Sequence, residues 1–323
     1  MIQDFRGELL TEFAGRPVNE FHVERLESLG RAVLPADVEN WAWRVAKETP
    51  YYGEFRKNVE LFVTSVDTTR VKALITGRWL DKHTGDTSTA AVAELLLEQA
   101  EWLPALEALF IGDIVSEDQE VSWIKQVDPG PVLAAFPELR VFGLRGTSSL
   151  TMAPLRHERL EELTFQGGGL PHRVAEALCA SELPSLTHLD LYLGEPSYYG
   201  DTVPKDLAPI LRGTAFPALR HLALRNAENQ DEIAAALARA PVVAQLETLD
   251  LSLGELSDEG AAALLAGQPL THLKSLDLHH HYLTDEMMQR LRKALPGTDL
   301  NLDEQCETEE WDGESIRYIA VSE

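Results

Sequence analysis

The sequence predicts an α/β solenoid in which about ten parallel strands form a concave face and helices cover the convex face. Three observations support this prediction. A short leucine pattern recurs along the chain, its recurrences start 21 to 33 residues apart, and the segments between them change from strand to helix periodicity. The length of 323 residues therefore indicates one capped array of repeats rather than two globular domains.

The repeated pattern is a leucine, two variable residues, a second leucine, one variable residue and a third leucine or an apolar substitute. Seven copies start at Leu106, Leu139, Leu160, Leu186, Leu219, Leu246 and Leu273. Weaker strand patterns lie before and after them, at 41–45, 71–76 and 299–302. A single strand and helix cannot bury these leucines alone, so we expect stacked neighbours to share one continuous core.

Helix start signals lie between the strands. Ser257 and Thr284 each precede two acidic residues and an apolar stretch, and a hydroxyl followed by acids favours the first turn of a helix. The stretch 54–66 also has a helical pattern. We expect residues 1–70 to form an N-terminal cap continuous with the solenoid, residues 71–302 the repeats, and residues 303–323 an acidic tail.

The segment 246–264, Leu-Glu-Thr-Leu-Asp-Leu-Ser-Leu-Gly-Glu-Leu-Ser-Asp-Glu-Gly-Ala-Ala-Ala-Leu, resembles the strand, turn and helix of ribonuclease-inhibitor-type leucine-rich repeats. The motifs that start at Leu109 (Leu-Phe-Ile-Gly-Asp-Ile), Leu276 (Leu-Asp-Leu-His-His-His-Tyr) and Arg317 (Arg-Tyr-Ile-Ala-Val-Ser-Glu) are similar to those of an uncharacterised bacterial leucine-rich-repeat family. The resemblance implies a horseshoe fold and no particular activity. The asparagine that such repeats usually carry at position nine is replaced, among others by Gly194, Gly254 and His281, so a ladder of asparagine hydrogen bonds is not expected.

The composition narrows the class of partner. The chain has 53 acidic and 28 basic residues, a formal net charge of −25, which argues against nucleic acid and anionic membranes and favours a protein or peptide with a basic surface. Residues 299–323 hold nine of the acids, so much of the excess lies outside the strands. The two cysteines are far apart, and we find no signal-peptide core or membrane span. We expect a cytoplasmic protein without a cofactor, and the oligomeric state stays open.

Positions three, five and seven of each repeat should face away from the leucine core. In the N-terminal half these positions are small and apolar. In the C-terminal half they supply the predicted binding residues Asp190, Tyr192, Arg225, Asp250, Asp277, His279, His188 and His221. Asp250 and Asp277 should be neighbours on adjacent strands, and such a pair needs a cation or a basic side chain beside it. Two interpretations follow: a metal site formed with His279, or a solvated polar face that binds protein.

Other residues carry more local predictions. His188 and His221 should be neighbours, which suggests a pH-sensitive binding surface. His281 replaces a hydrogen-bonding asparagine, so a structural role in the turn is favoured over metal binding. The long loop 194–201 adds Tyr198 and Tyr199 as interface residues on the rim. Glycines 167–169 lack the remainder of a phosphate-binding motif and indicate a tight turn.

These observations predict a non-enzymatic scaffold that binds a protein or peptide through its concave face and loop rim, as an accessory or inhibitor of a cytoplasmic protein. The alternative is an enzyme with a metal-assisted or acid/base site on the concave face. A broad open sheet excludes water poorly, and this weakens the alternative.

Overall fold

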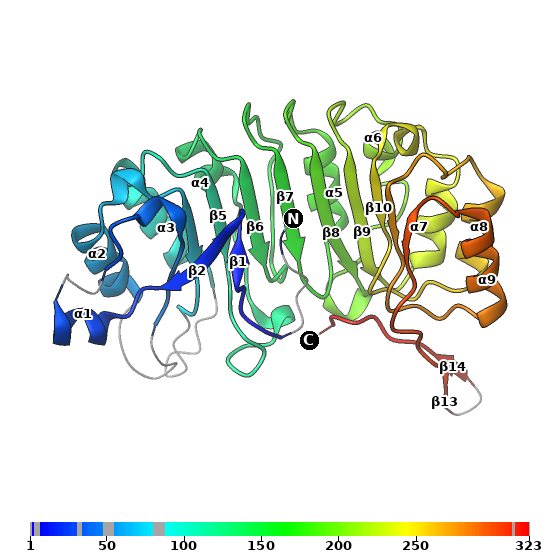
Figure 1. Cartoon of the computed structure of the whole chain (residues 1–323), viewed down its shortest axis with the longest axis horizontal. Helices are drawn as coiled ribbons and strands as arrows, with labels where there is room; N and C mark the ends of the chain where they lie inside the picture. The colour runs from blue at the N-terminus through cyan, green and yellow to red at the C-terminus, as the bar shows by residue number, and fades with distance from the viewer. Residues whose placement is uncertain are drawn as a thin grey trace. The chain divides into compact units, whose positions relative to one another are not determined.

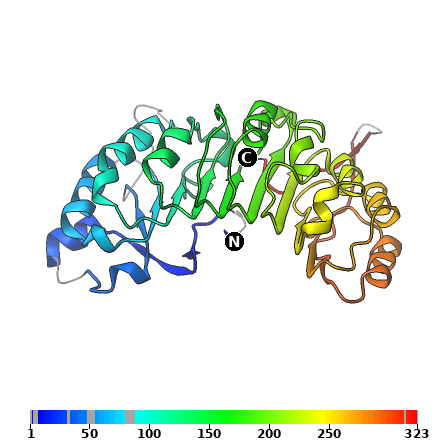
Figure 2. The same ribbon diagram turned by 90° about the horizontal axis from the view of Figure 1, so that it is seen from above.

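The computed structural model describes residues 2, 7–30, 34–47, 55–79, 88–311 and 314–322. The chain divides into two compact units, which we call unit 1 (residues 1–152 and 156–166) and unit 2 (residues 153–155 and 167–322). In each unit parallel strands follow one another in chain order, and helices lie on one side of them (Figures 1 and 2). This confirms the predicted α/β leucine-rich-repeat solenoid.

Unit 1 begins with a short antiparallel pair, β1 (Glu12–Phe13) and β2 (Arg16–Glu20). Parallel strands then follow β2 in order: β3 (Ala42–Val45), β4 (Ala73–Thr76), β5 (Ala108–Ile111), β6 (Val141–Arg145) and β7 (Glu162–Gln166). The helices are α1 (Val23–Leu29), α2 (Phe55–Ser65), α3 (Ala90–Gln99) and α4 (Gly130–Ala135), with short 3₁₀ turns at Val38–Asn40, Thr68–Arg70, Ala100–Trp102 and Val121–Trp123.

Unit 2 contains the parallel strands β8 (His188–Gly194), β9 (His221–Ala227), β10 (Thr248–Asp250), β11 (Ser275–Asp277) and β12 (Asp299–Asn301). Its helices are α5 (His172–Cys179), α6 (Ala208–Leu211), α7 (Gln230–Leu237), α8 (Asp258–Ala266) and α9 (Asp285–Ala294), with 3₁₀ turns at Pro196–Tyr198 and Pro241–Gln245. A hairpin of β13 (Glu309–Trp311) and β14 (Glu314–Ile316) follows.

The strands pair in the register that the leucine pattern predicts. Leu249 pairs with Leu222 on one side and Leu276 on the other, and all three are buried. Asp250 pairs with Asp277, as expected. Burial of one leucine row per repeat fixes which residues face the opposite side, because side chains alternate along a strand.

The helix start signals are also confirmed. The Ser257 hydroxyl accepts a hydrogen bond from the Glu259 amide at the start of α8, and the Thr284 hydroxyl accepts one from the Met287 amide at the start of α9, both at 3.2 Å. Each cap satisfies one of the backbone amides that have no partner within the helix.

The sequence did not predict β2. Its residues, Arg-Pro-Val-Asn-Glu, lack the leucine pattern, and the strand forms because Val18 pairs in parallel with Ala42 of β3. The predicted strand at 41–45 is present as β3, and the helical stretch at 54–66 as α2.

The small apolar half of the predicted concave face is covered. Ile2, Leu10 and Phe13 pack against side chains of β4 and β5 that point away from the helices, and the Phe13 and Phe110 rings meet edge to face with centroids 5.9 Å apart. Apolar side chains on an open sheet would be exposed to water, so this cover forms a second core in unit 1. The uncovered polar part of the predicted concave face therefore lies in unit 2.

Candidate functional site

The open strand face of unit 2 is polar. Position five of successive strands carries Asp190, Ala223, Asp250, Asp277 and Asn301, and each carboxylate there is partly exposed. Regular spacing of parallel strands, at about 4.8 Å, lines these side chains up in one row across the sheet. We call this row, together with Arg225, the acidic row.

Arg225 joins two members of the acidic row. Its guanidinium donates two hydrogen bonds to Asp190, at 2.9 and 2.6 Å, and one to Asp250 at 3.2 Å. The short side chain of Ala223 lies between these two aspartates in the row and leaves space for the arginine to cross. A two-pronged arginine–carboxylate pair fixes both groups in orientation. The basic side chain that the paired aspartates require is thus Arg225.

The C-terminal end of the acidic row is held differently. Asp277 accepts hydrogen bonds from the backbone amide and ring Nδ1 of His279, at 2.9 and 2.8 Å, and from the side-chain amide of Asn301 at 3.1 Å. Burial disfavours ionisation of Asp277, but the bonds from His279 outweigh it and hold the pKa of this carboxyl below its usual value.

The pKa of Asp250 is shifted in the opposite direction. Burial raises the pKa of Asp250 from 3.8 to about 6; Arg225 opposes the rise, and the charge of Asp277 adds to it. The two side chains are 23% and 28% exposed, so both can be reached from solvent. Above pH 6 the acidic row therefore presents two adjacent carboxylates, an arrangement suited to a positively charged group.

Position seven is less accessible than the sequence predicts. The sequence places Tyr192, Arg225 and His279 on the open face, whereas all three side chains are buried. The Arg225 guanidinium covers the Tyr192 ring, 4.8 Å from its centroid, in a cation–π contact. These residues therefore shape and support the acidic row rather than present contact surface of their own.

His188 and His221 are brought together, as expected. Their rings stack at 3.7 Å with an angle of 10° between the planes. The Nδ1 atom of His221 lies 2.7 Å from the Thr248 hydroxyl, and that of His188 lies 3.0 Å from the Thr187 hydroxyl. Both imidazoles are partly exposed at position three, two residues before the acidic row, so the pair adds contact surface for a ligand.

The predicted structural role of His281 is confirmed. Its Nδ1 accepts a hydrogen bond from the Leu283 amide at 3.1 Å, and its Nε2 lies 3.2 Å from the Leu302 carbonyl, to which it donates. Burial lowers the pKa of His281, which favours the neutral ring that these two bonds require. Gln230 has a similar role two repeats away: its side chain donates to the Leu224 carbonyl and accepts from the Ala227 amide.

The rim loop after β8 carries the two predicted tyrosines. Tyr199 is 65% exposed and has a left-handed backbone, whereas Tyr198 is partly buried. The glycines beside this loop allow close backbone packing: a Cβ on Gly169 would lie 2.2 Å from the Tyr198 carbonyl oxygen. Tight packing, rather than phosphate binding, explains the glycine run.

Unit 1 contains a buried ionic cluster that the sequence did not reveal. Arg44 and Arg145 both pair with Asp113, with nitrogen to oxygen distances of 2.6 and 3.1 Å, and all three side chains are buried. Asp113 also accepts a hydrogen bond from the Leu10 amide, and Arg44 donates to the Leu10 carbonyl. This cluster anchors the segment that covers β4 and β5. Its members lie 34 to 135 residues from Leu10 in sequence, so no local pattern marks them.

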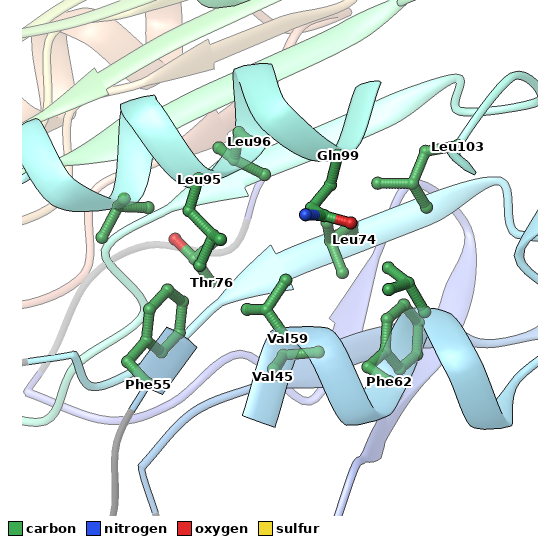
Figure 3. Close-up of a pocket in the computed structure, with 12 residues that line it drawn as sticks. Val45, Phe55, Val59, Phe62, Leu74, Thr76, Leu95, Leu96, Gln99 and Leu103 are labelled. Atoms are coloured by element: carbon green, nitrogen blue, oxygen red, sulfur yellow. The ribbon is translucent and has the colours of Figure 1, made fainter. Parts of the chain in front are cut away.

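The metal-site interpretation finds no support among the described residues. Within the described ranges, no three His, Cys, Asp or Glu side chains converge as ligands for a metal ion. A pocket between α2, α3, β3 and β4 is lined mainly by aliphatic side chains and Phe55 and Phe62 (Figure 3). It has a volume of about 10 Å³, room for roughly one water molecule.

None of the helices in the described part of the chain combines the length and apolar character needed to cross a lipid bilayer. Comparison with protein-family models and with curated proteins gives no match in either case.

Solved structures that are similar to this chain include two from bacteria. A protein from Bacteroides fragilis, determined as a structural genomics target, is 32% identical with a TM-score of 0.72; the match covers 80% of this chain and 74% of that one. A leucine-rich-repeat protein from Leptospira interrogans is 15% identical with a TM-score of 0.36, and the match covers 90% of this chain and 60% of that one. The second likeness is too low to support an argument.

Proposed function

We propose that this chain, which belongs to the same family as the Bacteroides fragilis protein of known structure, is a non-enzymatic scaffold that binds a protein or peptide through the acidic row and the rim loop of unit 2. The observation that carries the proposal is the imbalance of charge in the row. Three carboxylates face one guanidinium, so two negative charges remain when all are ionised.

The chemistry of the acidic row favours a lysine or arginine side chain of the partner. A carboxylate pair on adjacent strands accepts hydrogen bonds from a cationic group, and charge-assisted bonds are stronger than neutral ones. The partly exposed imidazoles and the exposed Tyr199 offer further contact surface in unit 2. We propose that Asp190, Asp250 and Asp277 select the charge of the partner, while His188, His221, Tyr198 and Tyr199 add contact area.

The finer sequence predictions belong to the same proposal. The resemblance to ribonuclease-inhibitor-type repeats supports, by fold analogy, an accessory or inhibitor of a cytoplasmic protein. We also propose that residues 1–70 cap the array, that residues 71–302 form the repeats and that residues 303–323 form an acidic tail. For the enzyme alternative the acidic row offers one acid/base group, Asp250, but that carboxylate already accepts bonds from Arg225 and the Ser252 amide.

Peptide arrays with a fixed central arginine, lysine, glutamate or alanine test the proposal. We expect the wild-type chain to bind arginine- and lysine-centred peptides above pH 6, and a double variant, Asp250→Asn with Asp277→Asn, to bind them at least 10-fold more weakly, about 1.4 kcal/mol. Glu232→Gln, an exposed acid on α7, makes the same type of charge change away from the row and should leave binding unchanged. Equal binding by a folded double variant would refute the proposal.

A further inference from the structure

Three successive repeats of unit 2 place a non-glycine residue with a left-handed backbone at the same repeat position. Asn226, Leu253 and His280 are each the eighth residue of their repeat and have φ angles of 54°, 65° and 55°. This conformation is unfavourable for an ordinary residue. Strain of this kind gathers at sites where it has a use.

All three residues contact the same segment, residues 318–322, which passes the C-terminal ends of the strands of unit 2 (red in Figure 1). The Ala320 amide donates to the Leu253 carbonyl at 2.8 Å. The side-chain amide of Asn226 contacts Val321 twice: its oxygen accepts from the Val321 amide at 2.9 Å, and its nitrogen donates to the Val321 carbonyl at 2.6 Å.

The other end of the segment is held at Tyr318. The Tyr282 hydroxyl lies 2.8 Å from the Tyr318 amide, from which it accepts, and 3.0 Å from the Tyr318 carbonyl, to which it donates. The Nε2 atom of His280 lies 3.1 Å from the same carbonyl. Contacts to backbone atoms of the segment do not depend on which side chains the segment carries.

The side chains of the segment alternate between buried and exposed. Ile319 and Val321 are each 6% exposed, whereas Tyr318 and Ala320 are exposed. This is the pattern of an extended strand that docks by its backbone and inserts every second side chain. Peptide-binding proteins that capture extended ligands use the same combination, with backbone bonds for affinity and alternate pockets for selectivity.

The residues that hold the segment favour its replacement by another peptide over a site that is left empty. The side chain of Asn226 is fully buried, so loss of Val321 would leave its amide without these two bonds, and a buried polar group that loses its partners is unfavourable. Burial of Ile319 and Val321 also stabilises the docked segment. Another extended peptide with the same features recovers both contributions, whereas simple opening recovers neither.

The charge around the segment favours a basic residue in the ligand. Burial, together with the nearby charges of Glu228 and Glu195, raises the pKa of Glu255 to about 7 against the opposing charge of Arg317. Arg317 directly precedes the segment and its guanidinium lies 5.5 Å from the centroid of the Tyr282 ring. A cation at this place in a ligand is therefore attracted by the acids of the rim.

We propose that Asn226, Leu253, His280 and Tyr282 form a binding site for an extended peptide of a partner protein, and that residues 318–322 of the chain fill this site until the partner replaces them. The ligand carries a basic residue followed by aliphatic side chains at alternate positions, as in Arg317, Ile319 and Val321. The site and the acidic row share no residue, and each is tested with its own probe and its own variants, so failure of one proposal can be told from failure of the other.

The test uses the full chain with Ile319→Asp and Val321→Asp, which releases the segment, and a fluorescein-labelled peptide of residues 317–323 as the probe. We expect fluorescence anisotropy to show at least 10-fold tighter binding to this variant than to the wild type, in which the segment competes. Adding Asn226→Gly keeps the left-handed backbone, removes the amide, and should reduce binding at least 10-fold. A probe with aspartate at both aliphatic positions serves as the negative control.

If the folded Ile319→Asp/Val321→Asp variant binds the probe no better than the wild type, the proposal is overturned. The same holds if this variant forms a dimer that binds no probe. Hydrogen exchange on the wild type provides a measurement that needs no variant. We expect the amides of Ala320 and Val321 to exchange at least 100-fold faster than those of Leu251 and Leu278, which bond within the strand ladder. Equal rates would show that the segment opens only when unit 2 unfolds, and would also overturn the proposal.

Discussion

Removal of the Arg225 charge is the most informative test of the acidic row. In Arg225→Met the aliphatic stem over Tyr192 is largely kept, while Asp190 and Asp250 lose the guanidinium that pairs with both. The arginine side chain is 5% exposed, and breaking a buried pair typically costs 3–5 kcal/mol. Because both aspartates are partly exposed, we expect the lower end, about 3 kcal/mol at pH 7.5, or a fall in Tm of roughly 6–12 °C.

The cost should depend on pH in one direction. Without Arg225 the folded-state pKa of Asp250 rises further above its unfolded value, so the folded variant binds more protons than the unfolded chain, and its stability falls as pH increases through the range 4 to 7. The difference between variant and wild type is therefore smallest at low pH. Urea denaturation at pH 5.0 and pH 7.5, followed by circular dichroism, measures both values.

Arg140→Met is a matched control. Arg140 makes a similar two-pronged pair with Glu161, at 2.9 and 2.8 Å, but both side chains are well exposed. Surface pairs contribute about 0–1 kcal/mol, so this variant should change stability little at either pH. A cost for Arg225→Met no larger than that of Arg140→Met, or one that is the same at both pH values, would refute the electrostatic account of the row.

Two further predictions concern single residues. Glu255→Gln should be more stable than the wild type by about 1–2 kcal/mol at pH 8 and equally stable at pH 4.5. The folded-state pKa of Glu255, about 7, makes ionisation of this carboxyl destabilising as pH rises from 4.5 to 7. Urea midpoints that differ equally at both pH values would contradict this prediction. His281→Ala should lower the free energy of unfolding by about 3 kcal/mol, because Leu283 and Leu302 lose a buried partner. A thermal shift within 1 °C of the wild type would show that these bonds do not stabilise the turn.

The strand positions could be predicted from the sequence because the leucine row is local and repeated. One buried leucine pair per strand fixes which neighbours face the other side, and this brought Asp250 beside Asp277 and His188 beside His221. The strand β2 could not be found in this way, because it lacks the leucine pattern and takes its place by pairing with β3.

Which parts of the open strand face are covered by other segments could not be predicted, because this depends on contacts between residues distant in sequence. Ile2, Leu10 and Phe13 cover the apolar half of the open face, and nothing in the repeats marks a need for them. Likewise, Leu253 carries no sequence signal for a left-handed backbone, although the asparagine at position 226 is a residue type that adopts it readily. Repeats predict the scaffold, whereas the segments outside the repeats decide which surface stays open.

Binding of a protein partner through the acidic row of unit 2 can be tested directly in the native cell. Affinity purification from the native cell, with mass spectrometry, tests it when the wild type, the Asp250→Asn/Asp277→Asn variant and Glu232→Gln serve as parallel baits. The account predicts a partner that is captured by the wild type and by Glu232→Gln, is lost with the double variant and is released as salt rises. Capture of the same partner by a folded double variant, or capture that does not weaken with salt, would contradict it.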